Sequence, residues 1–343
     1  MSKYRAGLFG LGYVAGEYIK ALNNNPLSEV VAVVGRDGEE TKQRISQMGI
    51  PCDVHGKFTE LVEREDIDVI AITSPHFLHA SQAIAAAQAG KHLIVEKPIG
   101  MTFAEVTQVA EAVKQAGVKF QTGLVLRWYP FALNVRQMID DGLLGEIFYL
   151  EVDYFHELGP WWNGFTWGVN KKSGGPSAPL VGGIHAIDAL RWFAGDEAEE
   201  VSAYQTWGHR KDFEYAPSYI ANVKFRNGAI GKTSCSYEIE SPYMMNFILY
   251  GTKGSIVNDM FYLKKSFPGQ TGWQRFETIM PDSGAVSHHP FQGLVDDFLE
   301  ALENDRETEL NIETTLKTHE LCFAIERSME SGKPVPLPLT DPV

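Results

Sequence analysis

Two titratable side chains in this sequence stand where they could perform proton chemistry, Lys97 and His185. Lys97 belongs to the triplet Glu96-Lys97-Pro98, which directly follows the apolar run HLIVE. His185 lies in the apolar stretch APLVGGIHAIDALRWFAG, and Asp188, three residues later, falls on the same face of the expected helix. A lysine can polarise an oxygen and a neutral histidine can accept a proton, which are acid–base roles. A histidine packed in a core is the alternative.

A glycine-rich turn near the amino terminus is a candidate phosphate site. The segment LFGLGYVAG contains Gly10-x-Gly12-x-x-Ala15, after a strand pattern and before a helix pattern. The glycines permit a tight turn and the close approach of a pyrophosphate, which then lies at the helix N-terminus. In this context the motif predicts a dinucleotide site with contacts from Gly10, Gly12, Tyr13 and Val14.

The end of the second strand bears on which dinucleotide is bound. An acidic residue for the ribose hydroxyls of NAD is expected about twenty residues past the glycine motif, but the chain has Gly35 followed by Arg36. The missing carboxylate removes repulsion toward a 2′-phosphate, and arginine supplies a bidentate partner for it. We therefore predict that NADP is favoured, while Asp37 leaves NAD possible.

Two longer segments carry a family resemblance. ITSPHFLHASQAIAAAQAGKHLIVEKPIG and SGGPSAPLVGGIHAIDALRWFAG, with the glycine loop, resemble the glucose-fructose oxidoreductase, inositol dehydrogenase and MocA family of NAD(P)-dependent sugar oxidoreductases. The resemblance covers nearly the whole chain. It implies that Lys97 touches the nicotinamide ribose and the substrate hydroxyl, and that the peptide before Pro98 is cis. It also implies that Arg127 contacts the substrate. The cofactor contacts that it implies are Ser74, His76, His79 and Glu96.

The chain departs from the family's second motif, which reads Asp-x-Gly-x-His-x-x-Asp. Gly183 and Asp188 match it, but Val181 replaces the first Asp, and the segment GGPSAP before it carries an extra residue. The resemblance thus implies a substrate site with one carboxylate fewer. Asp188 could orient His185, bind a substrate hydroxyl or pair with Arg191.

An aromatic loop precedes this motif. The segment YFHELGPWWNGFTWGVNKKSGG holds His156, Trp162 and Lys172, which we predict to bind substrate, because tryptophan faces stack on sugar C–H surfaces. The alternative is that these rings pack against a second subunit. Two histidine pairs, at positions 76 and 79 and at 288 and 289, have no accompanying set of metal ligands, and no metal is expected.

The surrounding elements predict two domains. In residues 1–124, apolar runs such as VVAVV and DVIAIT alternate with helical stretches, which indicates a Rossmann-type α/β domain with a doubly wound parallel sheet. In residues 125–343, strand patterns follow one another, and Asn227-Gly228 marks a hairpin. This favours an α+β domain with a large, mostly antiparallel open sheet, for substrate binding and oligomerisation.

Composition limits the partners. The 343 residues carry a formal net charge of -14, which argues against binding nucleic acid or an anionic membrane. No signal-like or membrane-spanning apolar run is found, so a cytoplasmic location is expected. Three cysteines are too few for a disulfide framework and predict free thiols.

Together these features predict an oxidoreductase that moves a hydride between NAD(P) and a carbinol carbon of a sugar, polyol or related small hydroxy compound. His185 would exchange the hydroxyl proton and Lys97 would polarise the oxygen. Two alternatives stay open: a non-catalytic NAD(P)-dependent sensor or regulator, and a redox-cycling lyase or glycosidase. We expect a homodimer or homotetramer formed through the open sheet.

Overall fold

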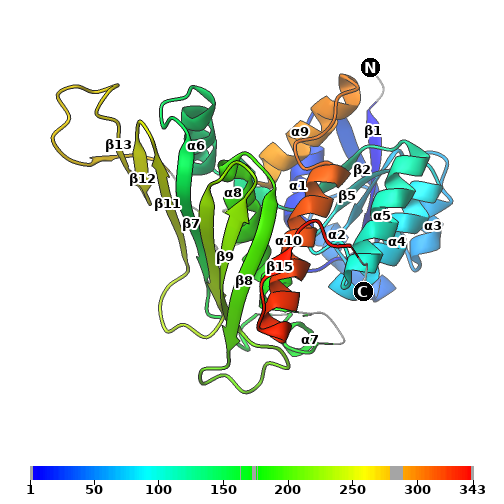
Figure 1. Ribbon diagram of the computed structural model, residues 1–343. Helices are drawn as coiled ribbons and strands as arrows, with labels where there is room; N and C mark the ends of the chain where they lie inside the picture. The colour runs from blue at the N-terminus through cyan, green and yellow to red at the C-terminus, as the bar shows by residue number, and fades with distance from the viewer. Residues whose placement is uncertain (1–2, 163, 172–174, 176, 279–288, 341–343) are drawn as a thin grey trace. The chain divides into compact units, whose positions relative to one another are not determined.

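The computed structural model describes residues 3–162, 164–171, 175, 177–278 and 289–340 (Figure 1). The chain forms two compact units. The first consists of Met1–Val125 with Pro290–Leu316, and the second of Leu126–His289 with Lys317–Asp341. The first unit therefore takes in a stretch from near the carboxyl terminus. The continuous domain limits 1–124 and 125–343 stay a prediction.

Six parallel strands form the sheet of the first unit, in the order β3-β2-β1-β4-β5-β6. Their apolar side chains are buried on both faces, as the near-continuous apolar runs require. The strands are β1 (Tyr4–Phe9), β2 (Ser28–Val34), β3 (Asp53–His55), β4 (Val69–Ile72), β5 (His92–Val95) and β6 (Phe120–Thr122). The predicted doubly wound parallel sheet is confirmed.

Helices connect these strands and cover the sheet. They are α1 (Ala15–Asn24), α2 (Gly38–Gln47), α3 (Phe58–Val62), α4 (His76–Gln88) and α5 (Phe103–Ala116). Helix α9 (Phe291–Glu303) packs on α1, where the rings of Tyr18 and Phe291 are 4.9 Å apart and Asn25 Nδ2 donates to Asp296 Oδ1 over 2.7 Å. These contacts explain why residues 290–316 belong to the first unit.

The second unit is built on a nine-stranded sheet in the order β14-β13-β12-β11-β7-β10-β9-β8-β15. All neighbours are antiparallel except β7 and β10. Asn227 and Gly228 join β9 to β10 as predicted, and Gly228 has a φ of 88°. The strands are β7 (Ile147–Phe155), β8 (Ala198–Thr206), β9 (Ser218–Phe225), β10 (Ile230–Ser236), β11 (Met244–Gly251), β12 (Ser255–Val257), β13 (Met260–Tyr262), β14 (Gln274–Arg275) and β15 (Val335–Pro336).

One face of this sheet is covered. Helix α8 (Ile184–Ala194) packs on β7 and β10, where a Cβ at Gly231 would lie 3.2 Å from the Leu190 side chain. The opposite face carries exposed apolar side chains, among them Tyr204, Ile220 and Ile230. The other helices are α6 (Pro130–Asp140), α7 (Phe165–Gly168) and α10 (Ile312–Ser331), besides a short helical turn at Val125–Trp128. No helix in the described ranges is long and apolar enough to cross a membrane.

Candidate functional site

The glycine loop connects β1 to α1 as the motif predicts. Gly10 has a φ of 95°, and a Cβ there would lie 2.6 Å from the backbone nitrogen of Ser74. Only glycine therefore lets this loop lie against the segment that follows β4. At Gly12 a Cβ would meet Thr73 O at 3.6 Å, an ordinary contact, so packing in the chain alone does not explain the second glycine.

The start of α1 offers the features of an anion site. Val14 directly precedes the helix, and the side chain of Tyr13 is about half exposed. The first N–H groups of a helix have no partner within it and carry partial positive charge. The loop and this helix start together fit the pyrophosphate of a dinucleotide.

The residue after β2 is constrained by its own surroundings. Gly35 is buried, and a Cβ there would lie 2.0 Å from Thr41 Oγ1. Thr41 therefore excludes an acidic side chain at position 35, where NAD-binding folds use one for the ribose. The next residue, Arg36, is exposed.

Asp37 is engaged in capping α2. Its Oδ1 accepts hydrogen bonds from the backbone N–H groups of Glu39 and Glu40, over 2.9 and 3.1 Å. This is the usual use of aspartate at a helix start. The cap orients one oxygen of Asp37 toward its own helix, which makes it a weaker candidate for binding a ribose.

Arg44 contacts the glycine loop, which the sequence did not predict. From α2, its guanidinium donates to Leu11 O over 2.5 Å and to Gly12 O over 3.4 Å. These bonds brace the loop and place a positive charge beside it. An exposed arginine on a polar helix face gives no sequence signal for such a long-range contact.

Lys97 follows β5 in a turn fixed by its neighbours. The peptide between Lys97 and Pro98 is cis. The backbone N–H of Lys97 donates to Glu96 Oε2 over 3.2 Å, and Tyr18 on α1 donates its hydroxyl to Glu96 Oε1 over 2.7 Å. Burial lowers the pKa of Lys97, although the Glu96 carboxylate opposes that shift. Burial raises the pKa of Glu96. A lysine of lowered pKa exchanges a proton more readily near neutral pH.

The loop after β4 supplies the remaining cofactor candidates. Ser74 donates its hydroxyl to Gln82 Oε1 over 2.7 Å, His76 begins α4, and His79 is fully buried. These residues follow β4, the glycine loop follows β1 and Lys97 follows β5. The carboxyl ends of neighbouring parallel strands lie at one edge of the sheet, so the structure brings these candidates to the edge where such folds bind ligands.

His185 stands at the start of α8 in the second unit. A π-helical turn, Pro179–Gly183, precedes it and contains the buried Val181. The His185 ring is half-buried and stacks on Tyr154 of β7, with centroids 6.0 Å apart and planes 25° apart. Gly182 allows this approach, since a Cβ there would lie 2.7 Å from the Tyr154 ring.

Tyr154 also begins a cluster of aromatic rings. Its hydroxyl lies 3.4 Å from His156 Nδ1. The His156 ring is 5.3 Å from that of Tyr243 and 5.6 Å from that of Trp161. Trp161 is 57% exposed, so the cluster ends on an accessible indole face. Of these residues, only His156 was singled out from the sequence.

Trp162 occupies a different position from its neighbour. Its ring packs on Trp167 at 5.5 Å and fills the space beside Gly164 and Gly168, where a Cβ would lie 2.6 and 2.4 Å from the indole. Trp161 is therefore the better candidate for stacking on a ligand. The predicted contact Lys172 lies outside the described residues.

Arg127 and Asp188 form a buried ion pair. Arg127 Nε donates to Asp188 Oδ2 over 2.9 Å and Nη2 donates to Oδ1 over 2.8 Å. Thr318 Oγ1 donates to Asp188 Oδ1 over 2.9 Å, and the guanidinium lies over the Trp192 ring at 5.1 Å. Arg191 pairs with Glu197, and its charge also acts on Asp188. The substrate roles of Arg127 and Asp188 stay a prediction, and the geometry favours a structural one.

The electrostatics of this pair agree with a structural role. Burial alone would raise the pKa of Asp188, but the Arg127 guanidinium, with the charge of Arg191 and the hydrogen bond from Thr318, holds the pKa below its usual range. A carboxyl with a lowered pKa in the folded state stabilises the fold above the ordinary aspartate range, and that stability is lost as the pH falls through the lowered value. The pair is therefore intact near neutral pH.

We expect Asp188→Asn to cost about 3–5 kcal/mol of stability, because it removes the carboxylate that pairs with the buried Arg127 charge. Asp212→Asn is the matched control. Asp212 makes a similar two-bond pair with Arg210, but its side chain is 41% exposed, so its loss should cost at most about 1 kcal/mol. Denaturant unfolding measures both. A raised KM for the substrate with unchanged stability would instead support the predicted role of Asp188 in substrate binding.

Glu326 on α10 is a further titratable group without a sequence signal. Burial raises its pKa to about 7, and a hydrogen bond from the Ser177 side chain opposes the shift. Ser177 lies just before the π-helical turn that leads to His185. Glu326 is therefore a buried titratable carboxyl, hydrogen-bonded to the segment that leads to His185.

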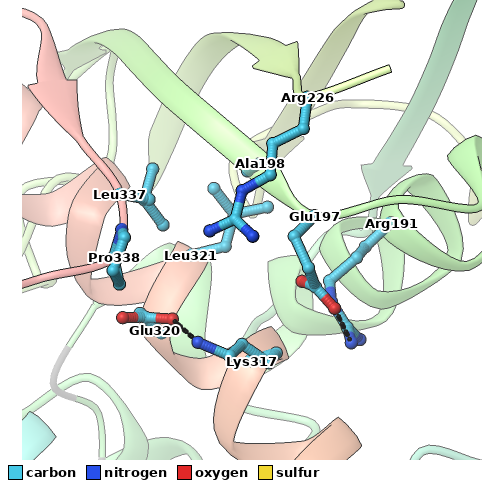
Figure 2. A pocket seen from close by; sticks show the side chains of 9 residues that line it. All are labelled: Arg191, Glu197, Ala198, Arg226, Lys317, Glu320, Leu321, Leu337 and Pro338. Atoms are coloured by element: carbon cyan, nitrogen blue, oxygen red, sulfur yellow. Dashed lines mark hydrogen bonds and ion pairs between the residues drawn. The ribbon is translucent and has the colours of Figure 1, made fainter.

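A pocket of the second unit, lined by residues of α8, the start of β8 and the first half of α10, is not part of the predicted site (Figure 2). Its charged groups pair with one another: Arg191 donates to Glu197 over 2.7 Å, and Lys317 to Glu320 over 2.8 Å. None of the candidate site residues lines it. Among the described residues, no group of three or more His, Cys, Asp or Glu side chains is placed to hold a metal ion.

The fold and the glycine loop define a Rossmann-type protein that fits a dinucleotide, and the comparisons with known proteins give its family. Residues 4–124 match the oxidoreductase family NAD-binding Rossmann fold, and residues 136–337 match the C-terminal alpha/beta domain of the same family. The chain belongs to the GFO/IDH/MocA oxidoreductase family. The resemblance seen in the sequence is thereby confirmed.

Characterised relatives are distant. A 1,5-anhydro-D-fructose reductase of Ensifer adhaerens is 27% identical over 254 residues, 74% of this chain and 75% of the relative. A 2,7-anhydro-N-acetylneuraminate hydratase of Mediterraneibacter gnavus is 25% identical over 266 residues, 74% of this chain and 66% of the relative. The structure of a levoglucosan dehydrogenase in complex with NADH and levoglucosan has a TM-score of 0.88 at 21% identity, and the match covers 98% of this chain and 100% of that one. The last likeness establishes the fold.

Proposed function

We propose that this protein moves a hydride between NAD(P) and a carbinol carbon of a sugar, polyol or related small hydroxy compound. The observation that carries the proposal is the turn at Lys97. A lysine whose pKa is lowered by burial follows β5, at the same edge of the sheet as the glycine loop. Similar relatives named for anhydro sugars support the substrate class.

The chain's own residues would act on the substrate hydroxyl and its proton. Lys97 binds and polarises the hydroxyl oxygen through its Nζ. His185 takes the hydroxyl proton during oxidation and returns it during reduction. Tyr154 holds the His185 ring by stacking on it, and the exposed face of Trp161 offers a surface for the C–H face of a cyclic substrate.

The glycine loop, Arg36 and Arg44 would hold the dinucleotide, which when bound accepts or supplies the hydride. NADP is favoured over NAD for two reasons. Thr41 excludes a carboxylate at Gly35, and Asp37 caps its own helix. The exposed Arg36 then has no acidic competitor at position 35 for a 2′-phosphate.

Arg36→Ala should weaken NADP binding by about 1 to 3 kcal/mol and NAD binding much less, because only NADP loses a charge-assisted pair. Calorimetric titration of both cofactors measures the difference. Lys42→Ala is the control, since it removes an exposed positive charge from α2 itself and should change neither affinity. Equal losses for the two cofactors in Arg36→Ala, or tighter NAD binding in the parent, would argue against NADP preference.

A redox-cycling lyase or hydratase is the second candidate. One relative is a hydratase, and a cofactor that oxidises a sugar transiently and reduces it again would leave no net redox product. A non-catalytic sensor is the third, because Val181 replaces a carboxylate of the family motif. Lys97 and His185 are both present, which favours catalysis over sensing.

Absorbance at 340 nm separates these functions. The protein would be incubated with NADP or NAD and a panel of cyclic sugars, anhydro sugars and polyols, and the sugar products analysed by mass spectrometry. Net reduction of the cofactor supports the oxidoreductase. A converted sugar without net reduction supports the lyase. Cofactor and sugar binding without conversion supports the sensor.

Assembly through the open face of the nine-stranded sheet is part of the proposal. Exposed apolar side chains lie on strands across that face, on β8, β9, β10 and β11: Tyr204, Ile220, Ile230 and Met244. An exposed apolar surface of this kind is typical of an interface. Light scattering of the protein in solution distinguishes a monomer from a dimer or tetramer.

A further inference from the structure

His79 lies between two loops of the first unit and contacts both. It is fully buried on α4. Its Nδ1 is 2.7 Å from Pro98 O, and its Nε2 is 2.7 Å from Ser74 O. Both ring nitrogens therefore contact backbone carbonyl groups, one on each side of the ring.

The two carbonyl groups belong to segments with different expected roles. Pro98 directly follows Lys97. Ser74 belongs to the loop after β4, against which Gly10 of the glycine loop packs so closely that a Cβ would lie 2.6 Å from its nitrogen. One imidazole ring thus joins the lysine turn to the segment that supports the glycine loop.

We propose that His79 is a positioning residue that holds the Lys97 turn in register with the cofactor loop. This inference rests on the proposed role of Lys97. The family resemblance implies a cofactor contact for His79, but both ring nitrogens face backbone carbonyl groups. In this proposal His79 acts instead through the backbone at Pro98.

Hydrogen bonds hold the Lys97 turn on its amino side, and His79 contacts it on its carboxyl side. On the amino side, Glu96 Oε2 accepts from the Lys97 backbone N–H, and Tyr18 holds Glu96 Oε1. On the carboxyl side, Pro98 has no N–H to donate, so the carbonyl is its only backbone hydrogen-bonding group. The contact to His79 engages that group.

The protonation state of His79 decides whether the ring donates a hydrogen bond to one carbonyl group or to both. A neutral imidazole has one N–H and donates to one carbonyl, whereas a protonated ring donates to both. Burial lowers the pKa of His79, and the contacts with Pro98 and Ser74 oppose that shift. The protonated ring bridges the two loops with a hydrogen bond to each, whereas the neutral ring donates to one carbonyl and only packs against the other.

His79→Phe tests the bridge, because phenylalanine retains a ring and lacks both nitrogens. We expect turnover to fall about 10- to 100-fold, as for a misplaced catalytic group, with a smaller change in substrate KM. In His79→Gln the amide N–H replaces one donor, so its turnover should be intermediate. Should the Phe variant not fold, the comparison uses His79→Gln, for which turnover equal to the parent's would overturn the proposal.

A double-mutant cycle distinguishes positioning from simple loss of stability. If His79 acts through Lys97, adding His79→Phe to Lys97→Met should change turnover by less than about 2-fold, because the group it positions is already gone. Multiplicative losses in the double variant would mean that His79 acts independently of Lys97.

Chemical labelling provides a readout that needs no substrate. Trace acetylation of folded protein, followed by peptide mass spectrometry, reports the reactivity of Lys97 relative to Lys91. Lys91 is anchored by its own bonds to Arg64 O and Ile67 O. We expect His79→Phe to change the ratio several-fold. An unchanged ratio would overturn the proposal even if no substrate were turned over, whereas a changed ratio without turnover would count against the proposed function alone.

His92→Phe is the matched control. His92 lies at the opposite end of β5, and its Nδ1 accepts a hydrogen bond from the Lys119 backbone N–H over 3.0 Å. Losing that bond should lower the melting temperature without changing turnover or Lys97 labelling. If His92→Phe and His79→Phe gave the same pattern of effects, His79 would have only a general structural role.

Discussion

Lys97→Met is expected to lower turnover at least about 100-fold, the low end for a positioned acid–base group, while folding and cofactor binding are retained. Methionine keeps most of the stem volume and removes only the ammonium group. Hydrogen bonds of the Lys97 backbone, of Glu96 and of Pro98 hold the surrounding turn, and the substitution leaves all of these groups in place. The loss should therefore appear in the chemistry rather than in the fold.

Lys91→Met is the control for this substitution. Lys91 directly precedes β5 and is buried, and its ammonium donates to Arg64 O over 2.7 Å and Ile67 O over 2.9 Å. Its removal should destabilise the protein without a specific effect on turnover. Steady-state kinetics and melting curves of both variants make the comparison. Near-normal turnover in Lys97→Met would refute the role assigned to Lys97.

The pH dependence gives a second test of Lys97. Because burial lowers its pKa, the ammonium loses its proton at a lower pH than a free lysine would. The parent enzyme should therefore show a change in rate below the ordinary lysine range, and Lys97→Met should lack it. If Lys97→Met still showed this change in rate with pH, the change would come from the titration of another group.

The fold could be predicted because its signals are local. Buried parallel strands read as continuous apolar runs, and the glycine motif falls between a strand and a helix, so alternation along the chain is enough to define the first sheet. The hairpin at Asn227-Gly228 likewise depends on two adjacent residues. The inclusion of residues 290–316 in the first unit has no such signal. It rests on contacts such as Tyr18 with Phe291, far apart in sequence.

The site could be predicted in part, for the same reason. Lys97 and the glycine loop belong to short motifs, whereas the partner of Asp188 is Arg127, 61 positions away on another element. The sequence offered Arg191 as one candidate partner; Arg191 forms an ion pair with Glu197, and its charge also acts on Asp188. Which of two adjacent tryptophans is exposed depends on how their loop folds back, and residue type cannot report it.

A π-helical turn lies where the sequence before His185 departs from the family motif. A π turn closes i→i+5 hydrogen bonds and so holds one residue more than an α-helical turn, and a π-helical turn lies at Pro179–Gly183, directly before α8. The turn contains Val181, the position of the missing carboxylate. The segment with the extra residue ends at Pro179, where this turn begins, so spacing taken from the family motif is least transferable there.

His185→Asn should abolish most turnover and remove the neutral limb of the pH profile. In the oxidation direction, the parent's rate should rise with pH through a group that titrates near neutrality, because only neutral imidazole accepts the proton. Asparagine keeps polarity but cannot titrate. The ring is half-buried and stacked on Tyr154, so the melting temperature should change little if His185 serves catalysis.

Glu326 is the rival source of a neutral limb, since burial raises its pKa to about 7. Glu326→Gln should leave the limb in place if His185 is the base, and His319→Asn, at a fully buried histidine of α10, measures the cost of losing a core histidine. If His185→Asn instead loses about 1 to 3 kcal/mol of stability with an unchanged pH profile, His185 is a packing residue. A limb lost only in Glu326→Gln would move the base to that carboxyl. The carboxylate of Glu326 on α10, rather than the His185 imidazole, would then accept the hydroxyl proton. Glu326 is not part of the family motif that contains His185.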